Sequence, residues 1–191
     1  MKSIIRNSLK EAEVVLSEFA DNPRNIDAIN NAANIMAQAI ANGNKIVACG
    51  NGGSLCDATH FAEELTARFR ENRKGLPAIA VNDPAFITCA LNDFSPTSIF
   101  ARYVEAVAVK GDVLLAISTS GNSRNIIEAA SAAKKIGLNV IALTGKDGGE
   151  LANLADVEIR APKTKFSDRA QEIHIKVIHI FVECIEEKIF K

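Results

Sequence analysis

The chain has 191 residues, a formal net charge of −1 and a hydrophobic content of 48%. This length fits one domain with a sizeable core, and the balanced charge gives no reason to expect a nucleic acid or an anionic membrane as a partner. No apolar run approaches the roughly 18 residues of a membrane span, and no signal-peptide core follows the N-terminus. The four cysteines form no CxxC pair, which predicts reduced thiols in a cytoplasmic protein and no zinc finger.

Two amphipathic stretches begin the chain, and both are predicted to be helices. They cover 2–19 and 24–42, with Pro23 early in the second and Gly43 at its end. We expect residues 1–43 to form a helical hairpin attached to an α/β core over 44–191, the two together making a single domain.

Short apolar segments alternate with helical stretches through the rest of the chain. The expected strands are 45–49, 77–81, 113–117, 139–143 and 156–160. The expected helices are 54–70, 84–91, 98–108 and 122–136, with a short turn at 148–154. Strands that are apolar on both faces and alternate with helices are typical of a parallel sheet covered on both sides. The pattern therefore predicts a three-layer α/β sandwich with a five-stranded parallel sheet.

The C-terminal segment 166–190 is locally ambiguous. Its residues 173–177 alternate like a strand, but the segment has no Gly or Pro. Ile173, Val177, Phe181 and Ile185 recur every four residues, which favours one long helix.

A glycine-rich turn at 50–53 joins the first expected strand to a helix. Such a turn lets backbone N–H groups approach a ligand, and the positive end of the helix dipole suits an anion. His60 and Glu64 follow on this helix at i and i+4, so their side chains share a face. The segment could thus serve both an oxygen-rich ligand and proton transfer.

A second candidate ligand loop is Ser118-Thr119-Ser120-Gly121-Asn122-Ser123. It follows an expected strand and begins a helix. A single serine there is an ordinary helix cap, whereas four hydroxyls in six residues favour a phosphate site. Ligands of such sheets bind at the carboxyl ends of the strands, where both loops lie.

All three histidines lie on predicted helices, where a lone histidine is more often a packed or surface residue. His60 and Glu64, taken with Gln171 and His179, nevertheless make a chemically plausible Zn²⁺ ligand set. Gln171 and His179 are eight residues apart, about 12 Å along a helix axis. Either the side chains stretch, or one of the two serves a neighbouring subunit.

Two further polar pairs have ordinary interpretations. Asn92-Asp93 reads as a loop turn, and Asp168-Arg169 as a helix cap with a surface charge. They gain a functional meaning only if the fold brings them to the pocket.

Several motifs together resemble one family over essentially the whole chain. They are CGNGGS (49–54), HFAEEL (60–65), ND (92–93), ISTSGNS (117–123), LTGKDGG (143–149) and DRAQEIHIKVIH (168–179). The serine-rich motif alone resembles any sugar isomerase (SIS) domain. The HFAEEL and DRAQEIHIKVIH segments are more specific, and with them the chain is similar to the bacterial phosphoheptose isomerases.

The resemblance implies a flavodoxin-like strand order, a cytoplasmic homotetramer with active sites near subunit contacts, and one Zn²⁺ per subunit. It implies an acid–base pair of Glu64 and His179. The zinc ligands would be His60, Glu64, Gln171 and His179. The phosphate would be held by Ser118, Thr119, Ser120 and Ser123. The other substrate contacts would be Asn51, Gly52, Gly53, Glu64, Asn92, Asp93, Asp168 and Gln171. Leu55 stands where a relative has His, so we expect an altered pocket rim without loss of activity.

The resulting hypothesis is an aldose–ketose isomerase that converts sedoheptulose 7-phosphate to D-glycero-D-manno-heptose 7-phosphate, the first step of nucleotide-activated heptose biosynthesis for lipopolysaccharide or capsule. The alternatives are a non-catalytic SIS tetramer that binds a replication-initiation protein and a sugar-phosphate sensor. Glu64 and the second histidine of the last helix count against the non-catalytic reading, and the lack of room for a DNA-binding region counts against the sensor.

Overall fold

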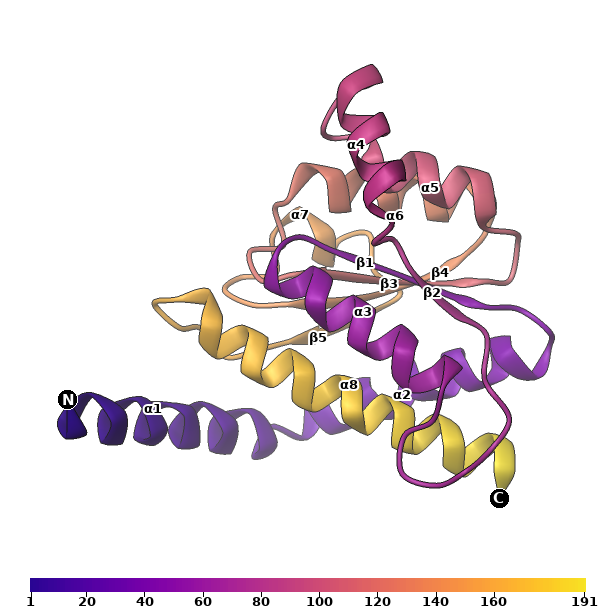
Figure 1. Ribbon diagram of the computed structural model, residues 1–191. Helices are drawn as coiled ribbons and strands as arrows, with labels where there is room; N and C mark the ends of the chain where they lie inside the picture. The colour runs from indigo at the N-terminus through magenta and orange to yellow at the C-terminus, as the bar shows by residue number, and fades with distance from the viewer.

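A five-stranded, fully parallel sheet forms the middle layer of the computed structural model, which describes all 191 residues (Figure 1). The strands run in the order β2-β1-β3-β4-β5, which confirms the flavodoxin-like prediction. In sequence they are β1 Ile46–Gly50, β2 Ala78–Ala80, β3 Val113–Ser118, β4 Asn139–Thr144 and β5 Val157–Arg160. The central strands β1 and β3 are buried at every residue, as near-continuous apolar runs in a doubly covered sheet require.

Helices cover both faces of this sheet. One face packs against α2 (Pro23–Ala41), α3 (Gly53–Thr66) and α8 (Ser167–Phe190), and these helices share a core of 33 buried residues with it. The other face packs against α5 (Ile99–Val107), α6 (Arg124–Ile136) and α7 (Gly149–Ala152), around 19 buried residues. Figure 1 shows α3 and α8 on one side of the strands and α5 and α6 on the other. The three predicted layers are therefore present.

The C-terminal segment is one α-helix, as the recurrence of apolar residues at every fourth position predicted, and not the strand that the local alternation allowed. Ile173, Val177, Phe181 and Ile185 are all buried in the same core cluster. Because α8 presents this stripe to the sheet, burial outweighs the low helix propensity of its β-branched residues.

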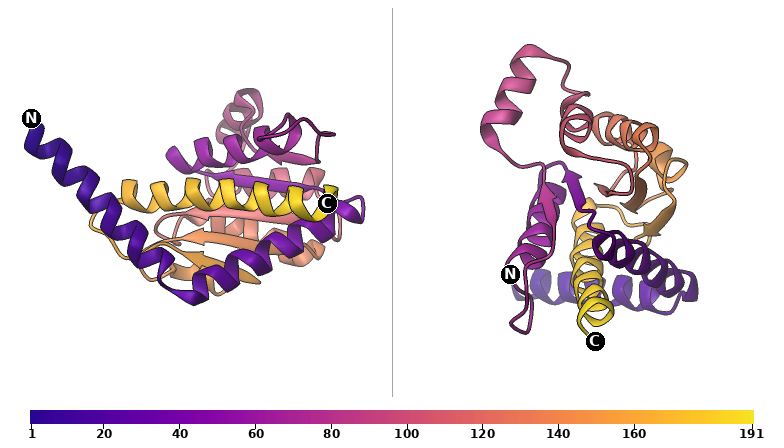
Figure 2. Two further views of the ribbon diagram at one scale, coloured as in Figure 1. Left: turned by 90° about the horizontal axis from the view of Figure 1, so that it is seen from below. Right: turned by 90° about the vertical axis from the view of Figure 1, so that its right-hand side faces the viewer.

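The two N-terminal helices, which the sequence predicted as a helical hairpin, are arranged as an open V. Helix α1 (Lys2–Ala20) extends beyond the body, as the view from below in Figure 2 shows. Helix α2 buries Ala32, Ala33 and Met36 in the core under the sheet. Since α2 faces the sheet with its apolar stripe, little of that stripe remains for α1. Apolar side chains of α1 such as Ile4 and Leu9 are exposed.

Three ends of the predicted helices differ from the structure by two or more residues. Helix α3 ends at Thr66 instead of 70, where Arg73 binds the carbonyl groups of its last turn. Helix α4 (Pro84–Asp93) continues two residues further than expected, and its first turn is capped by Asp83. Helix α6 begins at Arg124 instead of 122, because Ser123 is its N-cap residue and has an extended backbone, with φ −67° and ψ 112°. No helix is both long enough and apolar enough to cross a bilayer.

Candidate active site

The glycine-rich turn after β1 is held tightly against the start of α3. A Cβ on Gly50 would collide with the backbone of Ser54, and Gly52 has a φ of 54°. Asn51 exchanges two hydrogen bonds of 2.9 Å with Asn125 at the start of α6. The turn after β1 and the turn after β3 are thus joined side by side at the carboxyl end of the sheet, where the strand order changes direction.

The serine-rich loop after β3 offers several hydrogen-bond donors. Ser118 is buried and its hydroxyl donates to Ser123 Oγ at 3.2 Å, while Ser120 Oγ accepts from the N–H of Asn122. The backbone N–H groups of Thr119, Ser120 and Ser123 make no hydrogen bond within the protein. These groups precede α6 at the positive end of its dipole, so the loop suits an anion such as phosphate.

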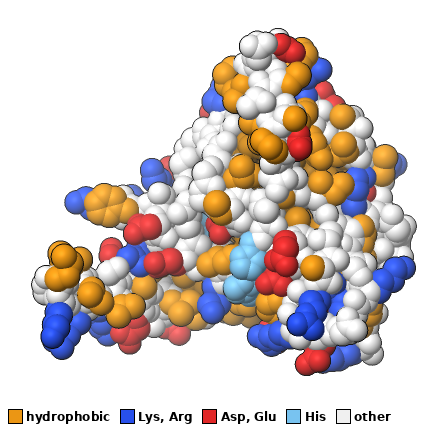
Figure 3. Space-filling model, in the orientation of Figure 1, with side chains coloured by type: hydrophobic (Ala, Val, Ile, Leu, Met, Phe, Trp, Pro, Cys, Tyr) orange, Lys and Arg blue, Asp and Glu red, His pale blue; other side chains and the backbone are white.

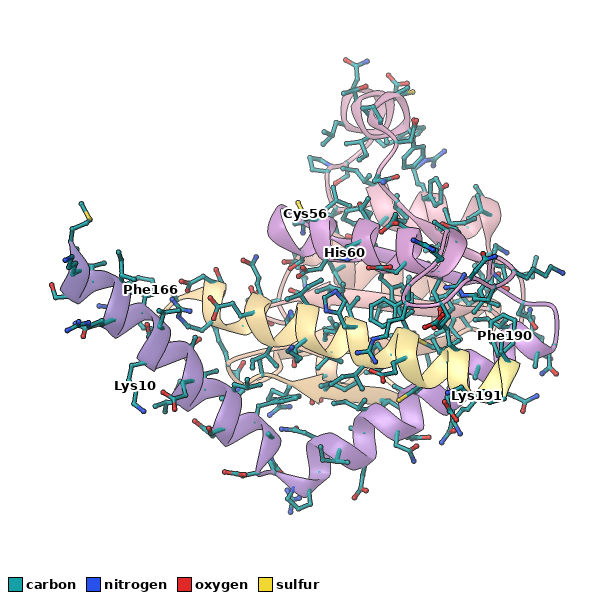
Figure 4. All side chains as sticks on the ribbon, turned by 60° about the horizontal axis from the view of Figure 1, so that its bottom comes forward. Lys10, Cys56, His60, Phe166, Phe190 and Lys191 are labelled. Atoms are coloured by element: carbon teal, nitrogen blue, oxygen red, sulfur yellow. The ribbon has the colours of Figure 1, made fainter.

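Three potential proton carriers or metal ligands meet between α3 and α8. His60 Nε2 lies 3.0 Å from Glu64 Oε1 and 3.5 Å from His179 Nε2. The side chain of Glu64 is only 16% exposed, whereas that of His60 is 41% exposed. Figure 3 shows histidine beside acidic side chains on this face, and Figure 4 shows His60 directed from α3 toward α8. The i, i+4 pair on α3 therefore meets the imidazole of α8.

This cluster fits a zinc ion by its donor set and its spacing. The ligand atoms of His60, Glu64 and His179 all lie within 4.8 Å of one another. Donors of a tetrahedral Zn²⁺ site with bonds of about 2.0–2.1 Å lie about 3.3 Å apart. Two imidazole nitrogens and a carboxylate oxygen leave a fourth position open, as in catalytic zinc sites.

Burial favours the neutral form of His179. It lowers the pKa of this imidazole below its usual range, and the neighbouring charge of His60 lowers it further, although Glu64 raises it. A neutral imidazole can bind a metal or accept a proton at pH 7. Phe69 packs at 5.7 Å from the His179 ring and contributes to this burial.

Gln171 lies at the other end of the contact between α3 and α8. A Cβ on Gly53 would be 2.5 Å from its Nε2, so Gln171 packs against the glycine-rich turn. Gly53 precedes His60 by seven residues, about 10 Å along the helix axis. Gln171 therefore lies at the glycine-rich turn, about two helical turns from His60, and the eight-residue separation of Gln171 and His179 is not bridged within one protomer.

The other predicted polar residues do not join the cluster within this chain. Asn92 and Asp93 lie at the end of α4, which projects away from the body (Figure 2, right). They are exposed and bond to each other at 2.7 Å. Asp168 is an exposed residue of the first turn of α8, 3.6 Å from the guanidinium of Arg169. Leu55, by contrast, lines a hollow of about 490 Å³ together with His60.

Sequence reasoning missed Asp57, which lies on the same helical stripe as Gly53, His60 and Glu64. Its Oδ2 is buried without a partner in the protein. Burial raises the pKa of Asp57 to about 6, and His60 opposes the shift. The i, i+3 spacing from Asp57 to His60 was the available signal.

Comparisons with known proteins identify the family of the chain. Residues 9–145 match the SIS domain family. Phosphoheptose isomerases of Shigella dysenteriae and Pectobacterium atrosepticum are each 56% identical to the chain, over 100% and 98% of it and over 99% and 97% of their own lengths. The chain belongs to the phosphoheptose isomerases of the SIS family.

Solved structures of phosphoheptose isomerases superimpose closely on the chain. That from Neisseria gonorrhoeae has a TM-score of 0.90 at 38% identity, covering 97% of this chain and 98% of its own. That from Francisella tularensis has a TM-score of 0.90 at 36% identity, covering 97% of each chain. Membership of the phosphoheptose isomerases therefore rests on sequence and on fold alike.

Proposed function

We propose that the chain isomerises the ketose sedoheptulose 7-phosphate to the aldose D-glycero-D-manno-heptose 7-phosphate. The observation that carries this proposal is the meeting of Glu64, His60 and His179 beside a hydroxyl-rich anion loop, in a chain 56% identical to phosphoheptose isomerases. Aldose–ketose isomerisation needs a proton carrier near C1 and C2 and an anchor for the distant phosphate, and the two regions supply one each.

The phosphate would bind at the serine-rich loop. Ser118, Thr119, Ser120 and Ser123 provide hydroxyl groups, and the unbonded N–H groups of the loop complete a cradle at the start of α6. Asn51, Gly52 and Gly53 of the adjoining turn lie toward the sugar chain. Anchoring one end of an extended substrate converts binding energy into correct placement of the reacting carbons.

Proton transfer is assigned to Glu64 and His179. Glu64 removes the C1 proton next to the C2 carbonyl, and the electron pair of the C–H bond forms the C1=C2 bond of a cis-enediol. The C2 oxygen gains a proton, and the C1 hydroxyl loses one when the aldehyde forms, with His179 carrying protons between these oxygens. Return of a proton to C2 completes the isomerisation. Carboxylates suit proton abstraction beside a carbonyl when they are partly desolvated, and the Glu64 side chain is 16% exposed.

Zinc would be held by His60, Glu64 and His179, with Gln171 as the further ligand that the family resemblance implies. When bound, it would polarise the substrate carbonyl and stabilise negative charge on the enediolate. Two imidazoles and a carboxylate are a donor set that suits this role.

A homotetramer would complete the site. Gln171 lies apart from His179 along α8, and Asn92, Asp93 and Asp168 lie outside the cluster of their own chain. The exposed apolar side chains of α1 offer a surface for subunit packing. We propose that neighbouring subunits bring these residues to one another's sites, that the enzyme acts in the cytoplasm, and that its product enters nucleotide-activated heptose synthesis for lipopolysaccharide or capsule.

A direct assay tests the function. The purified protein is incubated with sedoheptulose 7-phosphate, with and without a metal chelator, and the aldose product is followed. Turnover that falls on chelation and returns with Zn²⁺ supports the enzyme and its metal. Binding of the sugar phosphate without turnover would favour a sensor or scaffold instead.

A further inference from the structure

Arg73 lies in the loop between α3 and β2, and its side chain is buried among backbone carbonyl oxygens at the end of α3. Its side chain is 7% exposed. Nη2 donates to the carbonyl oxygen of Glu64 at 2.6 Å, and Nη1 donates to that of Leu65 at 2.7 Å. Nη1 also approaches the carbonyl oxygens of Ala67 and Lys74, at 3.2 and 3.3 Å. One cation thus satisfies the carbonyl groups that a helix C-terminus leaves without partners.

The same guanidinium reaches the second helix of the site. Its Nε donates to Glu186 Oε1 of α8 at 2.7 Å, and the Glu186 side chain is only 16% exposed. Glu186 follows His179 by seven residues, two helical turns, so both lie on the same side of α8. Arg73 therefore connects the turn that carries Glu64 to the helix that carries His179.

We propose that Arg73 is a positioning residue, which sets the separation of Glu64 and His179 by clamping the C-terminal turn of α3 to α8. The inference rests on the proposed function. The distances it controls are short: Glu64 and His179 each contact the same nitrogen of His60, at 3.0 and 3.5 Å. A displacement of about 1 Å at such a site can cost on the order of 100-fold in rate.

A lysine cannot replace this arginine. Its ammonium group is a single point of charge, whereas the planar guanidinium donates in three directions at fixed angles. Arg73→Lys keeps the charge near Glu186 but loses at least one of the bonds to Glu64 and Leu65. The conservative variant therefore separates geometry from charge.

The chain offers two matched controls. Arg70, in the loop after α3, pairs with Glu183 of α8 at 2.6 Å, but its side chain is 62% exposed. An exposed ion pair contributes little to the stability of the structure around it. Arg70→Ala should therefore leave turnover within about threefold of wild type. Asp112→Asn removes a buried carboxylate at the opposite end of the sheet, and it reports the effect of lost stability alone.

The test compares steady-state kinetics, Zn²⁺ binding to the chelator-treated protein and the thermal midpoint for all four variants and wild type, with Arg73→Ala as the full deletion. For Arg73→Lys we expect kcat to fall about 10–100-fold and Zn²⁺ affinity to fall by a similar factor, with KM changed far less. The folded fraction is checked by circular dichroism.

Three outcomes would overturn the clamp. One is an Arg73→Lys protein with wild-type kcat and wild-type Zn²⁺ affinity. Another is an equal loss of kcat in Asp112→Asn and in the Arg73 variants when these proteins have the same thermal midpoint. The third is an equal loss in Arg70→Ala. If wild type itself lacks turnover, the proposed function fails, while the Zn²⁺ affinities still decide whether Arg73 positions the ligands.

Discussion

Two aspartates at opposite ends of the molecule differ in their hydrogen-bond partners and in the direction of their pKa shifts. Asp112, before β3, is completely buried and accepts hydrogen bonds from Asn44, from Val109 and twice from Lys45. Burial raises its pKa, but these donors outweigh burial and leave the pKa lowered. Asp57, on α3, has a buried oxygen without a protein partner, and its pKa is raised to about 6.

The contrast separates a structural end from a functional end of the sheet. A carboxylate whose partners all come from its own chain stabilises the fold. At the carboxyl end, several polar groups lack partners within the protein: Asp57 Oδ2 and the N–H groups of Thr119, Ser120 and Ser123. Groups left in this state are available to a ligand, and removing them should cost activity more than stability.

The largest effect is expected at the functional end. Glu64→Gln preserves shape but removes the base, so kcat should fall about 10²–10⁴-fold. The thermal midpoint should stay near that of wild type, because no buried apolar contact is lost. Turnover assays measure the fall in kcat, and calorimetry measures the thermal midpoint. Near-normal turnover would remove Glu64 from the mechanism.

At the opposite end of the sheet, a substitution of Asp112 should lower stability and leave kcat unchanged. Asp112→Asn leaves Lys45 without its anionic partner, and we expect unfolding to become easier by about 2–3 kcal/mol. The value lies below that of a fully buried pair because the Lys45 side chain keeps 22% exposure. Urea unfolding measures it, and kcat per folded molecule should be unchanged. A large loss of kcat would show that the two ends are coupled.

His174 allows a test of how the stability of the fold depends on pH. It is fully buried, its Nε2 donates to the carbonyl oxygen of Thr144 at 2.8 Å, and burial lowers its pKa to about 4. The unfolded chain binds this proton near pH 6.5, so the stability contribution is complete above that pH and is lost toward pH 4. The loss amounts to about 3 kcal/mol at most. His174→Gln, which keeps an amide donor, should flatten this part of the stability profile; an unchanged slope would assign it to other groups.

The smallest effect is expected at Asp57, with the reverse sign. Its folded pKa is raised above the unfolded value of 3.8, so the folded state holds the proton more tightly and loses stability as pH rises from about 4 to 6. In metal-free protein at pH 7, Asp57→Asn should therefore be more stable than wild type, by less than about 2 kcal/mol because the carboxyl is only half-buried. The gain should vanish below pH 4. Lower stability at pH 7 would show that Asp57 has a partner in the folded protein.

Local patterns were sufficient to predict most of the fold. Apolar runs identified all five strands, and their alternation with helices led to the parallel sheet. The i, i+4 spacing of His60 and Glu64 placed both on one face, because helical geometry is independent of the rest of the chain. Contacts between distant segments were not predictable in this way. The burial of Asp57, the packing of Gln171 on Gly53 and the reach of Arg73 to Glu186 depend on how α3 lies against α8.

The fate of one hydrogen tests the central claim most directly, namely that Glu64 passes a proton between C1 and C2 of the sugar. Sedoheptulose 7-phosphate is converted by wild-type enzyme in D₂O, and the aldose is analysed by proton NMR. Because the Glu64 side chain retains contact with solvent, the proton it carries should exchange, and deuterium should appear at C2. Product formed at full rate with no deuterium at C2, by wild type and by Glu64→Gln alike, would contradict the assignment of Glu64 as the base.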